Sequence, residues 1–144
     1  GCCGEKIAKL LYKLGAGVIV AARRKEVREN IRRDGFIAID FDEMEKVIGD
    51  VSTVINTVPA MVLTEPCIRR MQPDASIIDI ASAPGGTDFE AAKKYNIKAK
   101  LALGLPGIYT TTSSAKLLKN AISKYAPLQN EMREGKSWIF QIII

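Results

Sequence analysis

The chain has 144 residues, of which 47% are hydrophobic and 26% are charged, and its formal net charge is +5. This length and composition fit one globular domain with a substantial core, and a modest, dispersed positive charge without an aromatic-rich motif argues against a nucleic-acid-binding protein. We expect no signal peptide and no membrane partner, because no apolar run approaches the roughly 20 residues that span a bilayer.

The chain contains no histidine. Because histidine is the commonest general acid or base, proton transfer would have to use other groups or another chain. The cysteines Cys2, Cys3 and Cys67 are odd in number and lack the spacing of metal ligands. We therefore expect a cytoplasmic protein without disulfides and without a metal site.

The first part of the chain predicts a helix followed by a strand. Apolar residues recur with helical spacing over residues 5–14, and residues 18–22 form a short apolar run. Gly1 and Gly4 have the Gly-x-x-Gly spacing found where a helix N-terminus faces a pyrophosphate in a dinucleotide-binding βαβ unit. The alternative is a simple helix start, since the first strand and the first glycine of the full motif are missing.

Two arginines, Arg23 and Arg24, follow the strand at 18–22. This position usually carries an acid that binds the ribose 2′-hydroxyl of NAD, whereas arginines suit the 2′-phosphate of NADP. The sequence therefore favours NADP, with NAD as the alternative cofactor and Lys25 as a weaker third contact. The competing interpretation is that both arginines are merely solvated.

Strands and helices then alternate. We expect a helix at 26–33, a strand at 36–39, a helix capped by Asp40, a strand at 51–56, a short helix at 63–71, a strand in 75–81 and a strand at 97–103. Thr57, Val58 and Pro59 leave the strand at 51–56, where small polar groups border a nicotinamide ribose, although a plain turn is the alternative.

The most informative stretch is the apolar run at 75–81, which leads into a Pro-Gly-Gly turn at 84–86. Ligands bind at the carboxyl ends of strands in open α/β sheets, so we expect the chemistry here. Residues 87–90 read as a capping box with Thr87 as the N-cap. The backbone N–H groups of Gly85 and Gly86 are candidate donors to an anionic substrate.

Catalytic residues stay undetermined, with three weak candidates. Asp79 and Asp88 could accept a proton, although Asp79 more often anchors backbone amides inside such a sheet and Asp88 more often stabilises a helix N-terminus. Tyr109 is a candidate acid, with packing as the alternative.

The alternation predicts an α/β fold with a doubly wound parallel sheet, that is, a Rossmann-like domain over residues 1–126 that lacks the usual first strand. Residues 127–144 form a C-terminal extension. Its apolar end predicts a strand at 138–144, which we expect to fill the vacant central position of the sheet, because unpaired buried strand edges are costly. The alternative is a frayed, aggregation-prone tail.

Three motifs carry a family resemblance, namely residues 56–60 (NTVPA), 79–89 (DIASAPGGTDF) and 104–107 (GLPG). In this order and spacing they resemble the C-terminal, nucleotide-binding half of the A-type subunit of dipicolinate synthase, from residue 1 to about residue 126. The middle motif is the most specific. The family's N-terminal domain is not matched.

The resemblance implies an NADP-linked oxidoreductase that forms dipicolinate from a hydroxytetrahydrodipicolinate or dihydrodipicolinate precursor in the mother cell of a sporulating bacterium. It implies a small dicarboxylate substrate, a homo-oligomer and, as partner, a flavoprotein-like B-type subunit of the same synthase. By position, Gly1 and Gly4 border the pyrophosphate, Arg23 and Arg24 the adenosine phosphate, and Thr57, Val58 and Pro59 the nicotinamide. The substrate pocket comprises Ser82, Pro84, Gly85, Gly86, Thr87, Gly104, Pro106 and Gly107.

Two other classes fit the same pattern. A 2-hydroxy acid dehydrogenase or adenosylhomocysteinase-type cofactor domain shares the architecture, although the missing histidine argues against the former. A non-catalytic dinucleotide-binding or subunit-docking module is the other alternative, because half of the resembled enzyme is not matched and the fragment alone is expected to be incomplete for catalysis.

Overall fold

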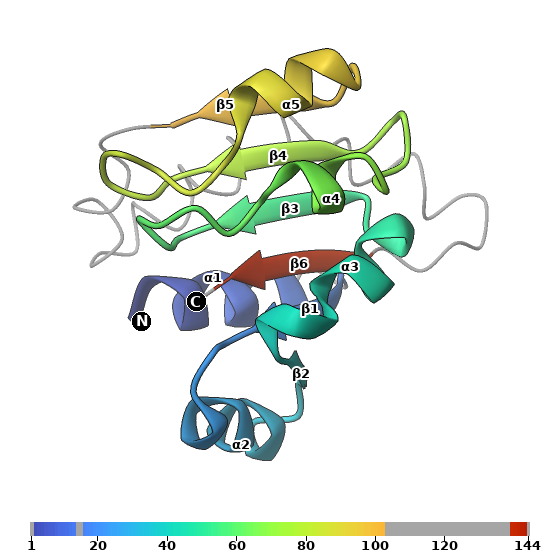
Figure 1. Ribbon diagram of the computed structural model, residues 1–144. Coiled ribbons are helices and arrows are strands. Elements are labelled where there is room, and N and C mark those ends of the chain that lie inside the picture. Colours follow the sequence, from blue (N-terminus) through green and yellow to red (C-terminus); the bar gives the residue numbers. More distant parts are fainter. Residues whose placement is uncertain (1, 14–15, 103–138, 144) are drawn as a thin grey trace.

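The computed structural model describes residues 2–13, 16–102 and 139–143. Within these ranges, six strands form one sheet in the order β2-β1-β6-β3-β4-β5, and every neighbouring pair is parallel (Figure 1). The elements are α1 (Cys2–Lys13), β1 (Gly17–Ala21), α2 (Lys25–Arg33), β2 (Ile37–Ile39), η1 (Phe41–Glu43), α3 (Met44–Val47), η2 (Ile48–Asp50), β3 (Thr53–Asn56), α4 (Glu65–Ile68), β4 (Ser76–Asp79), α5 (Phe89–Lys94), β5 (Lys98–Leu101) and β6 (Ile139–Ile143).

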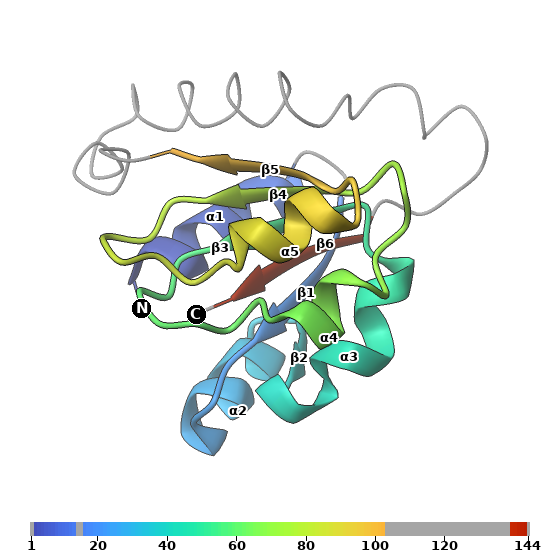
Figure 2. The same ribbon diagram turned by 45° about the horizontal axis from the view of Figure 1, so that its top comes forward.

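Helices cover both faces of the sheet, as Figure 2 shows for α1 on one side and α3, α4 and α5 on the other. One buried cluster joins α1 and α2 to β1 and includes Ile7, Leu11 and Ile31. A second joins α3, α4 and α5 to the opposite face and includes Met44 and Ile68. Since a parallel sheet is stable only with both faces covered, the predicted doubly wound α/β fold is confirmed.

The strand β6 lies at the centre of the sheet. Residues 139–143 pair with Gly17–Ala21 of β1 on one side, and residues 140–143 pair with Thr53–Asn56 of β3 on the other. This is the position that the sequence analysis assigned to residues 138–144. The pairing gives the backbones of both β1 and β3 a partner along their length, so the edges that a missing first strand would expose are closed.

Two helices differ from their predicted bounds. The helix expected at 5–14 begins at Cys2, so that Gly4 lies inside its first turn and not before it. The helix expected at 63–71 is only Glu65–Ile68, with Pro66 in its first turn as predicted. The reason is that the N–H of Leu63 donates to the carbonyl of Gly86 at 2.9 Å, which holds Leu63 in an extended segment before the helix can begin.

Asp40 follows β2 and is the N-cap of the short helix η1, as expected. Its carboxylate accepts from the N–H of Asp42 at 3.4 Å, and Glu43 Oε2 accepts from the N–H of Asp40 at 2.7 Å, which completes a capping box. The single predicted helix is divided into η1, α3 and η2.

The thiol of Cys67 is free and buried, and burial raises the pKa of this thiol, so it stays protonated and unreactive near neutral pH. Among the described residues, no group of three or more His, Cys, Asp or Glu side chains could hold a metal ion. The described helices are too short or too polar for any of them to cross a membrane.

Candidate functional site

The predicted site residues that the structure describes gather at the carboxyl ends of the strands. Asn56, the last residue of β3, pairs with Asp79, the last residue of β4, so the two strands end at the same level. Arg23 and Arg24 follow β1 at the same edge. The start of α1 also lies at this end of the sheet, beside the arrowheads of β3, β4 and β6 (Figures 1 and 2).

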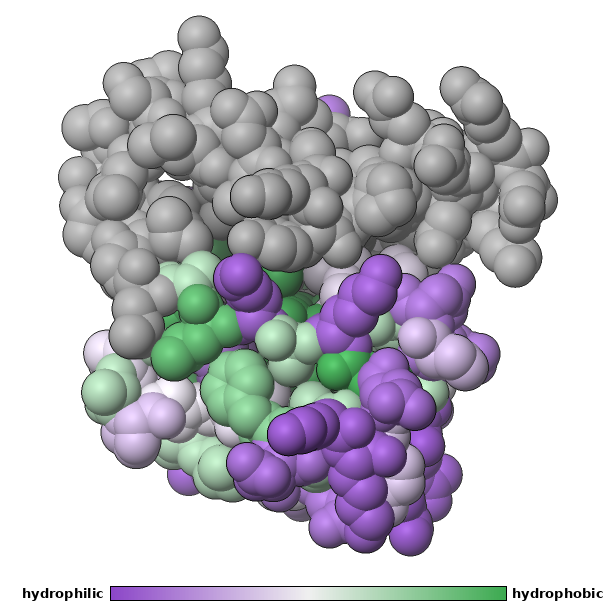
Figure 3. All heavy atoms as spheres, turned by 90° about the horizontal axis from the view of Figure 1, so that it is seen from above, coloured by the Kyte–Doolittle hydropathy of each residue, from purple (hydrophilic) through white to green (hydrophobic). Residues whose placement is uncertain are grey.

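Viewed from the β5 side, hydrophobic side chains of the described surface gather toward this same end, whereas hydrophilic side chains concentrate toward the opposite end (Figure 3). The loop after β4 contributes Ser82, Ala83 and Pro84 as exposed residues, while Gly85 and Gly86 are buried. The exposed part of this loop is therefore the part available to a ligand.

Asp79 is the anchor of the site. Its side chain is fully buried and accepts four hydrogen bonds. Oδ1 accepts from the N–H of Ala81 at 3.0 Å, and Oδ2 accepts from Asn56 Nδ2 at 3.0 Å, the N–H of Gly86 at 3.0 Å and Thr87 Oγ1 at 2.7 Å. With both oxygens engaged and no exposure to solvent, this placement favours the anchoring interpretation of Asp79 over a role as proton acceptor.

Asn56 connects this anchor to the loop after β3. Its Nδ2 donates to the carbonyl of Val58 at 3.0 Å as well as to Asp79, and its Oδ1 accepts from the N–H of Val58 at 3.0 Å. The turn that carries Thr57, Val58 and Pro59 is thus folded against the end of β3. Thr57 and Val58 are half-buried and Pro59 is exposed.

Gly86 brings the two loops into direct contact. Its carbonyl accepts from the N–H groups of Val62 and Leu63, and the carbonyl of Leu63 accepts from the N–H of Asp88 at 3.0 Å. The loops after β3 and β4 therefore form one hydrogen-bonded unit, which we call the paired loops (residues 57–64 and 80–88).

Any side chain at position 86 would disturb the paired loops. A Cβ built on Gly86 would lie 2.5 Å from the carbonyl oxygens of Val58 and Ala60 and closer still to Asn56 Nδ2. Only glycine allows this approach.

We expect Gly86→Ala to lower the free energy of unfolding by about 1–3 kcal/mol, because two backbone carbonyls must move to admit the methyl group. Urea unfolding followed by circular dichroism measures the change. Ser82→Ala, in the exposed part of the same loop, should stay within about 0.5 kcal/mol of the unsubstituted chain. Equal stability of all three proteins would show that the loops yield freely at this point.

The predicted capping box at 87–90 is wrong in its register. Asp88 is the N-cap of α5, and its Oδ1 accepts from the N–H of Ala91 at 3.0 Å. Thr87 is buried and donates to Asp79. A buried carboxylate without donors would cost more free energy than the loss of a second N-cap. The hydroxyl of Thr87 is therefore already used inside the protein. The expected role of Asp88 as a helix cap is confirmed.

The two backbone donors expected to bind an anionic substrate are also engaged. The N–H of Gly85 donates to the carbonyl of Ser82 at 2.8 Å, and that of Gly86 donates to Asp79. The structure therefore contradicts the prediction that both groups point at a ligand. The reason is that the tight turn, with Gly85 at a φ of +81°, closes the N–H of Gly85 on Ser82, while the buried carboxylate of Asp79 takes that of Gly86.

Arg23 and Arg24 are exposed at the end of β1. The guanidinium of Arg23 lies over the ring of Phe41, 5.4 Å from its centroid. Within the described ranges, neither arginine side chain has a hydrogen bond or an ion pair, so both charges are available to a ligand.

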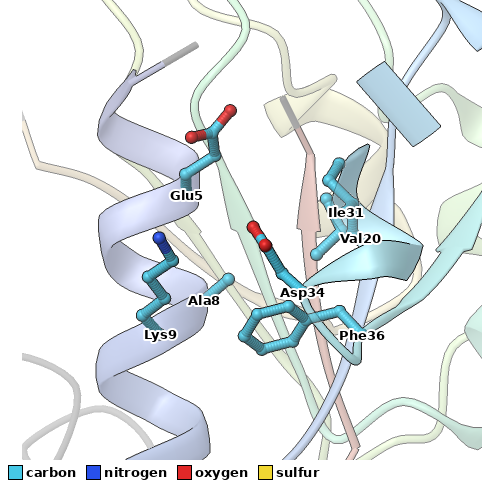
Figure 4. A pocket seen from close by; sticks show the side chains of 7 residues that line it. All are labelled: Glu5, Ala8, Lys9, Val20, Ile31, Asp34 and Phe36. Atoms are coloured by element: carbon cyan, nitrogen blue, oxygen red, sulfur yellow. The ribbon is translucent and has the colours of Figure 1, made fainter. Parts of the chain in front are cut away.

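A small hollow between α1 and the end of α2 does not compete with this edge. It is about 10 Å³, which is room for roughly one water molecule. Glu5, Lys9 and Asp34 surround it beside Phe36 (Figure 4).

The remaining predicted residues Gly1, Gly104, Pro106, Gly107 and Tyr109 lie outside the described residues, as do residues 103–138 in general. The sequence analysis missed two features of the site. One is the amide of Asn56 bonded to Asp79, which could have been inferred because both residues end neighbouring parallel strands. The other is the contact between Arg23 and Phe41, for which no local signal exists.

Comparison with known proteins supports the family resemblance. No family model matches the chain. The chain is 41% identical over 137 residues to the A-type subunit of dipicolinate synthase from Bacillus subtilis (strain 168), which covers 94% of this chain and 46% of that protein. The chain thus spans about half the length of this curated relative, and the resemblance to the A-type subunit of dipicolinate synthase is confirmed over that half.

Two solved structures agree with this result. The crystal structure of the A-type subunit of dipicolinate synthase from Bacillus subtilis matches with a TM-score of 0.72 and 40% identity, over 91% of this chain and 44% of that chain. The crystal structure of the corresponding protein from Bacillus halodurans matches with a TM-score of 0.73 and 36% identity, over 88% and 44%.

Proposed function

We propose that this chain, which is related to the A-type subunit of dipicolinate synthase over nearly its whole length, is the dinucleotide-binding half of an NADP-linked oxidoreductase that forms dipicolinate. The observation that carries the proposal is the convergence of three features at one edge of the sheet. These are the start of α1, the exposed Arg23 and Arg24, and the paired loops. In Rossmann-like domains this is the edge at which a dinucleotide binds.

The residues present fit the cofactor. Gly4 is buried in the first turn of α1, where a helix N-terminus can face a pyrophosphate. Arg23 and Arg24 would hold the 2′-phosphate by charge-assisted hydrogen bonds. Thr57, Val58 and Pro59 would flank the nicotinamide side, which Asn56 holds in place from within the sheet.

When bound, NADP supplies the hydride acceptor for oxidation of a ring carbon. The chain's own contribution is to bind and orient. Ser82 and Pro84, in the exposed part of the loop after β4, would shape the pocket for a small dicarboxylate. Asp79 and Asp88 are both engaged in structural hydrogen bonds, and the chain has no histidine. We therefore assign proton transfer to a group other than these two carboxylates, either Tyr109 of this chain or a group elsewhere in the whole enzyme.

A non-catalytic dinucleotide-binding or docking module is the second candidate. It is favoured by the share of the relative that the chain matches, which leaves about half of that protein unaccounted for. NADP binding by this chain without turnover, together with turnover when the half of the relative that this chain does not match and the B-type subunit of the synthase are added, would support the oxidoreductase proposal. Turnover in neither case would favour the module.

The double variant Arg23→Ala with Arg24→Ala tests the cofactor assignment. We expect NADP binding to weaken about 10- to 100-fold, because charge-assisted hydrogen bonds to the 2′-phosphate contribute roughly 1.5–3 kcal/mol. NAD binding should change less than about twofold, since NAD lacks that phosphate. Titration calorimetry with both dinucleotides measures the two affinities.

Arg33→Ala is the matched control, because Arg33 is an exposed arginine whose side chain donates a hydrogen bond to Asn30 of the same helix. It should leave both affinities unchanged. Equal weakening of NAD and NADP in the double variant would contradict the assignment of the 2′-phosphate. Failure of the folded, unsubstituted chain to bind either dinucleotide would overturn the proposed function.

A further inference from the structure

We infer that Arg28, Asp40 and Phe41 hold Arg23 in the pose that selects NADP over NAD, although none of the three is assigned a contact with the dinucleotide. The inference rests on the proposed function and adds its specificity-determining support. The three residues come from α2, the end of β2 and η1, and they converge on the segment that leaves β1. We call Arg28, Asp40 and Phe41 the arginine support.

Arg28 fixes the backbone of this segment. Its Nη1 donates to the carbonyl of Ala22 at 2.8 Å and to that of Arg23 at 2.6 Å, and it lies 2.8 Å from Asp40 Oδ2. Its side chain is only 15% exposed. The guanidinium thus bridges the end of β1 to the end of β2 and sets where the chain turns at Arg23.

Asp40 orders the segment that carries Phe41, and Phe41 contacts the side chain of Arg23. Asp40 is held by the capping box of η1 while its second oxygen pairs with Arg28. Phe41 follows directly and packs, half-buried, against the core cluster on the α3 and α4 side of the sheet. This packing restricts the position of the ring that lies against the Arg23 guanidinium.

Arg28 and Arg23 have different functions in this arrangement. Asp40 neutralises Arg28, which serves the protein backbone, whereas the guanidinium of Arg23 lies over the Phe41 ring and makes no hydrogen bond or ion pair within the described residues. The guanidinium presents its donors in one plane, which suits bidentate binding of a phosphate, and the contact with Phe41 limits where that plane can lie. Because the side chain is already ordered, binding costs less conformational entropy.

Two variants test the arginine support. Phe41→Leu keeps an apolar side chain but removes the ring, and we expect NADP affinity to fall about three- to tenfold with NAD affinity within about twofold. Arg28→Lys keeps the charge, but its Nζ ends one bond closer to the backbone than the Nη1 atom that makes all three contacts of Arg28. We expect it to lose part of these contacts and to lower the ratio of NADP to NAD affinity in the same direction. Phe41→Tyr, which restores a ring, should restore the ratio.

The chain offers matched controls for both. Phe36→Leu removes another half-buried ring, which contacts Tyr12 on the opposite side of the sheet, and Arg33→Lys alters an exposed arginine of α2. Neither should change the ratio. Titration calorimetry with NADP and NAD at one ionic strength, on variants with native circular dichroism, gives the ratios.

The outcomes separate this inference from the proposed function. If Arg23→Ala lowers the ratio but Phe41→Leu and Arg28→Lys do not, Arg23 binds the phosphate without the support and the inference is wrong. If Phe41→Leu and Phe41→Tyr lower the ratio equally, the ring is not what matters, and the inference is again wrong. If the unsubstituted chain binds neither dinucleotide, the proposed function fails, and the inference fails with it.

Discussion

Replacing Gln141 by proline is expected to destabilise the whole sheet, although it changes one residue of a five-residue strand. Position 141 pairs with Ile19 of β1 and with Val54 of β3, so its backbone lies between two neighbours. Proline removes one ladder N–H and restricts φ, and it is tolerated on edge strands but not in the middle of a sheet. We expect a loss of about 3 kcal/mol or more in the free energy of unfolding.

Gln141→Ala is the matched control, because it keeps the backbone N–H at the same position. Thermal and urea unfolding, followed by circular dichroism, should show a large loss for proline and a much smaller one for alanine. Removal of residues 137–144 should cost still more, since β1 and β3 would both lose their central partner. Undiminished melting temperature and solubility after this removal would contradict the central position of β6.

The sheet was predictable because the pattern of apolar residues that specifies each strand and helix is local and periodic. Residues 75–81 are apolar apart from Ser76 and Asp79, which do not alternate regularly with the apolar residues. Such runs alternate along the chain with helical patterns, and together they indicate a parallel sheet covered on both faces. The place of β6 followed from a different argument, namely that buried backbone needs partners and that the usual strand order leaves one position vacant. Helix ends were less predictable, as α4 illustrates.

Two of the errors in the site, the register of the helix cap and the donor assigned to Gly86, have one physical cause. Thr87 and Asp88 are both good N-caps, so the local sequence could not decide between them. The choice is made by Asp79, whose buried carboxylate takes the hydroxyl of Thr87 from eight residues away. The same carboxylate takes the N–H of Gly86, which the sequence analysis had left available for an anion. The hydrogen bonds of the buried Asp79 thus determine the conformation of the loop, and a sequence pattern of a few neighbouring residues does not predict them.

Asp79→Ala is expected to be the most damaging substitution of a single side chain at the site. It would leave four donors without their acceptor, namely Asn56 Nδ2, the N–H groups of Ala81 and Gly86, and Thr87 Oγ1. Each buried, unsatisfied donor costs about 1–3 kcal/mol, so the sum is comparable with the roughly 5–15 kcal/mol that stabilises a typical domain. We expect this variant to be largely unfolded, as judged by circular dichroism.

Asp79→Asn gives the sharper test because it preserves the shape of the side chain. Oδ2 accepts three of the four hydrogen bonds and Oδ1 the fourth, so either orientation of the amide turns an NH₂ group toward at least one donor. We expect a loss of about 2–4 kcal/mol in urea unfolding, since a buried donor then faces a donor. Asp88→Asn is the matched control and should change stability by less than about 1 kcal/mol, because asparagine caps helices as well as aspartate does.

The same variant separates the two roles considered for Asp79. An anchor predicts that Asp79→Asn loses stability and dinucleotide affinity together, because the paired loops lose the carboxylate that joins them. A proton acceptor predicts unchanged stability and affinity with loss of turnover in the whole enzyme. Four internal hydrogen bonds and a fully buried side chain favour the first result. The second would mean that this carboxylate is freed when substrate binds, and it would contradict the anchoring role.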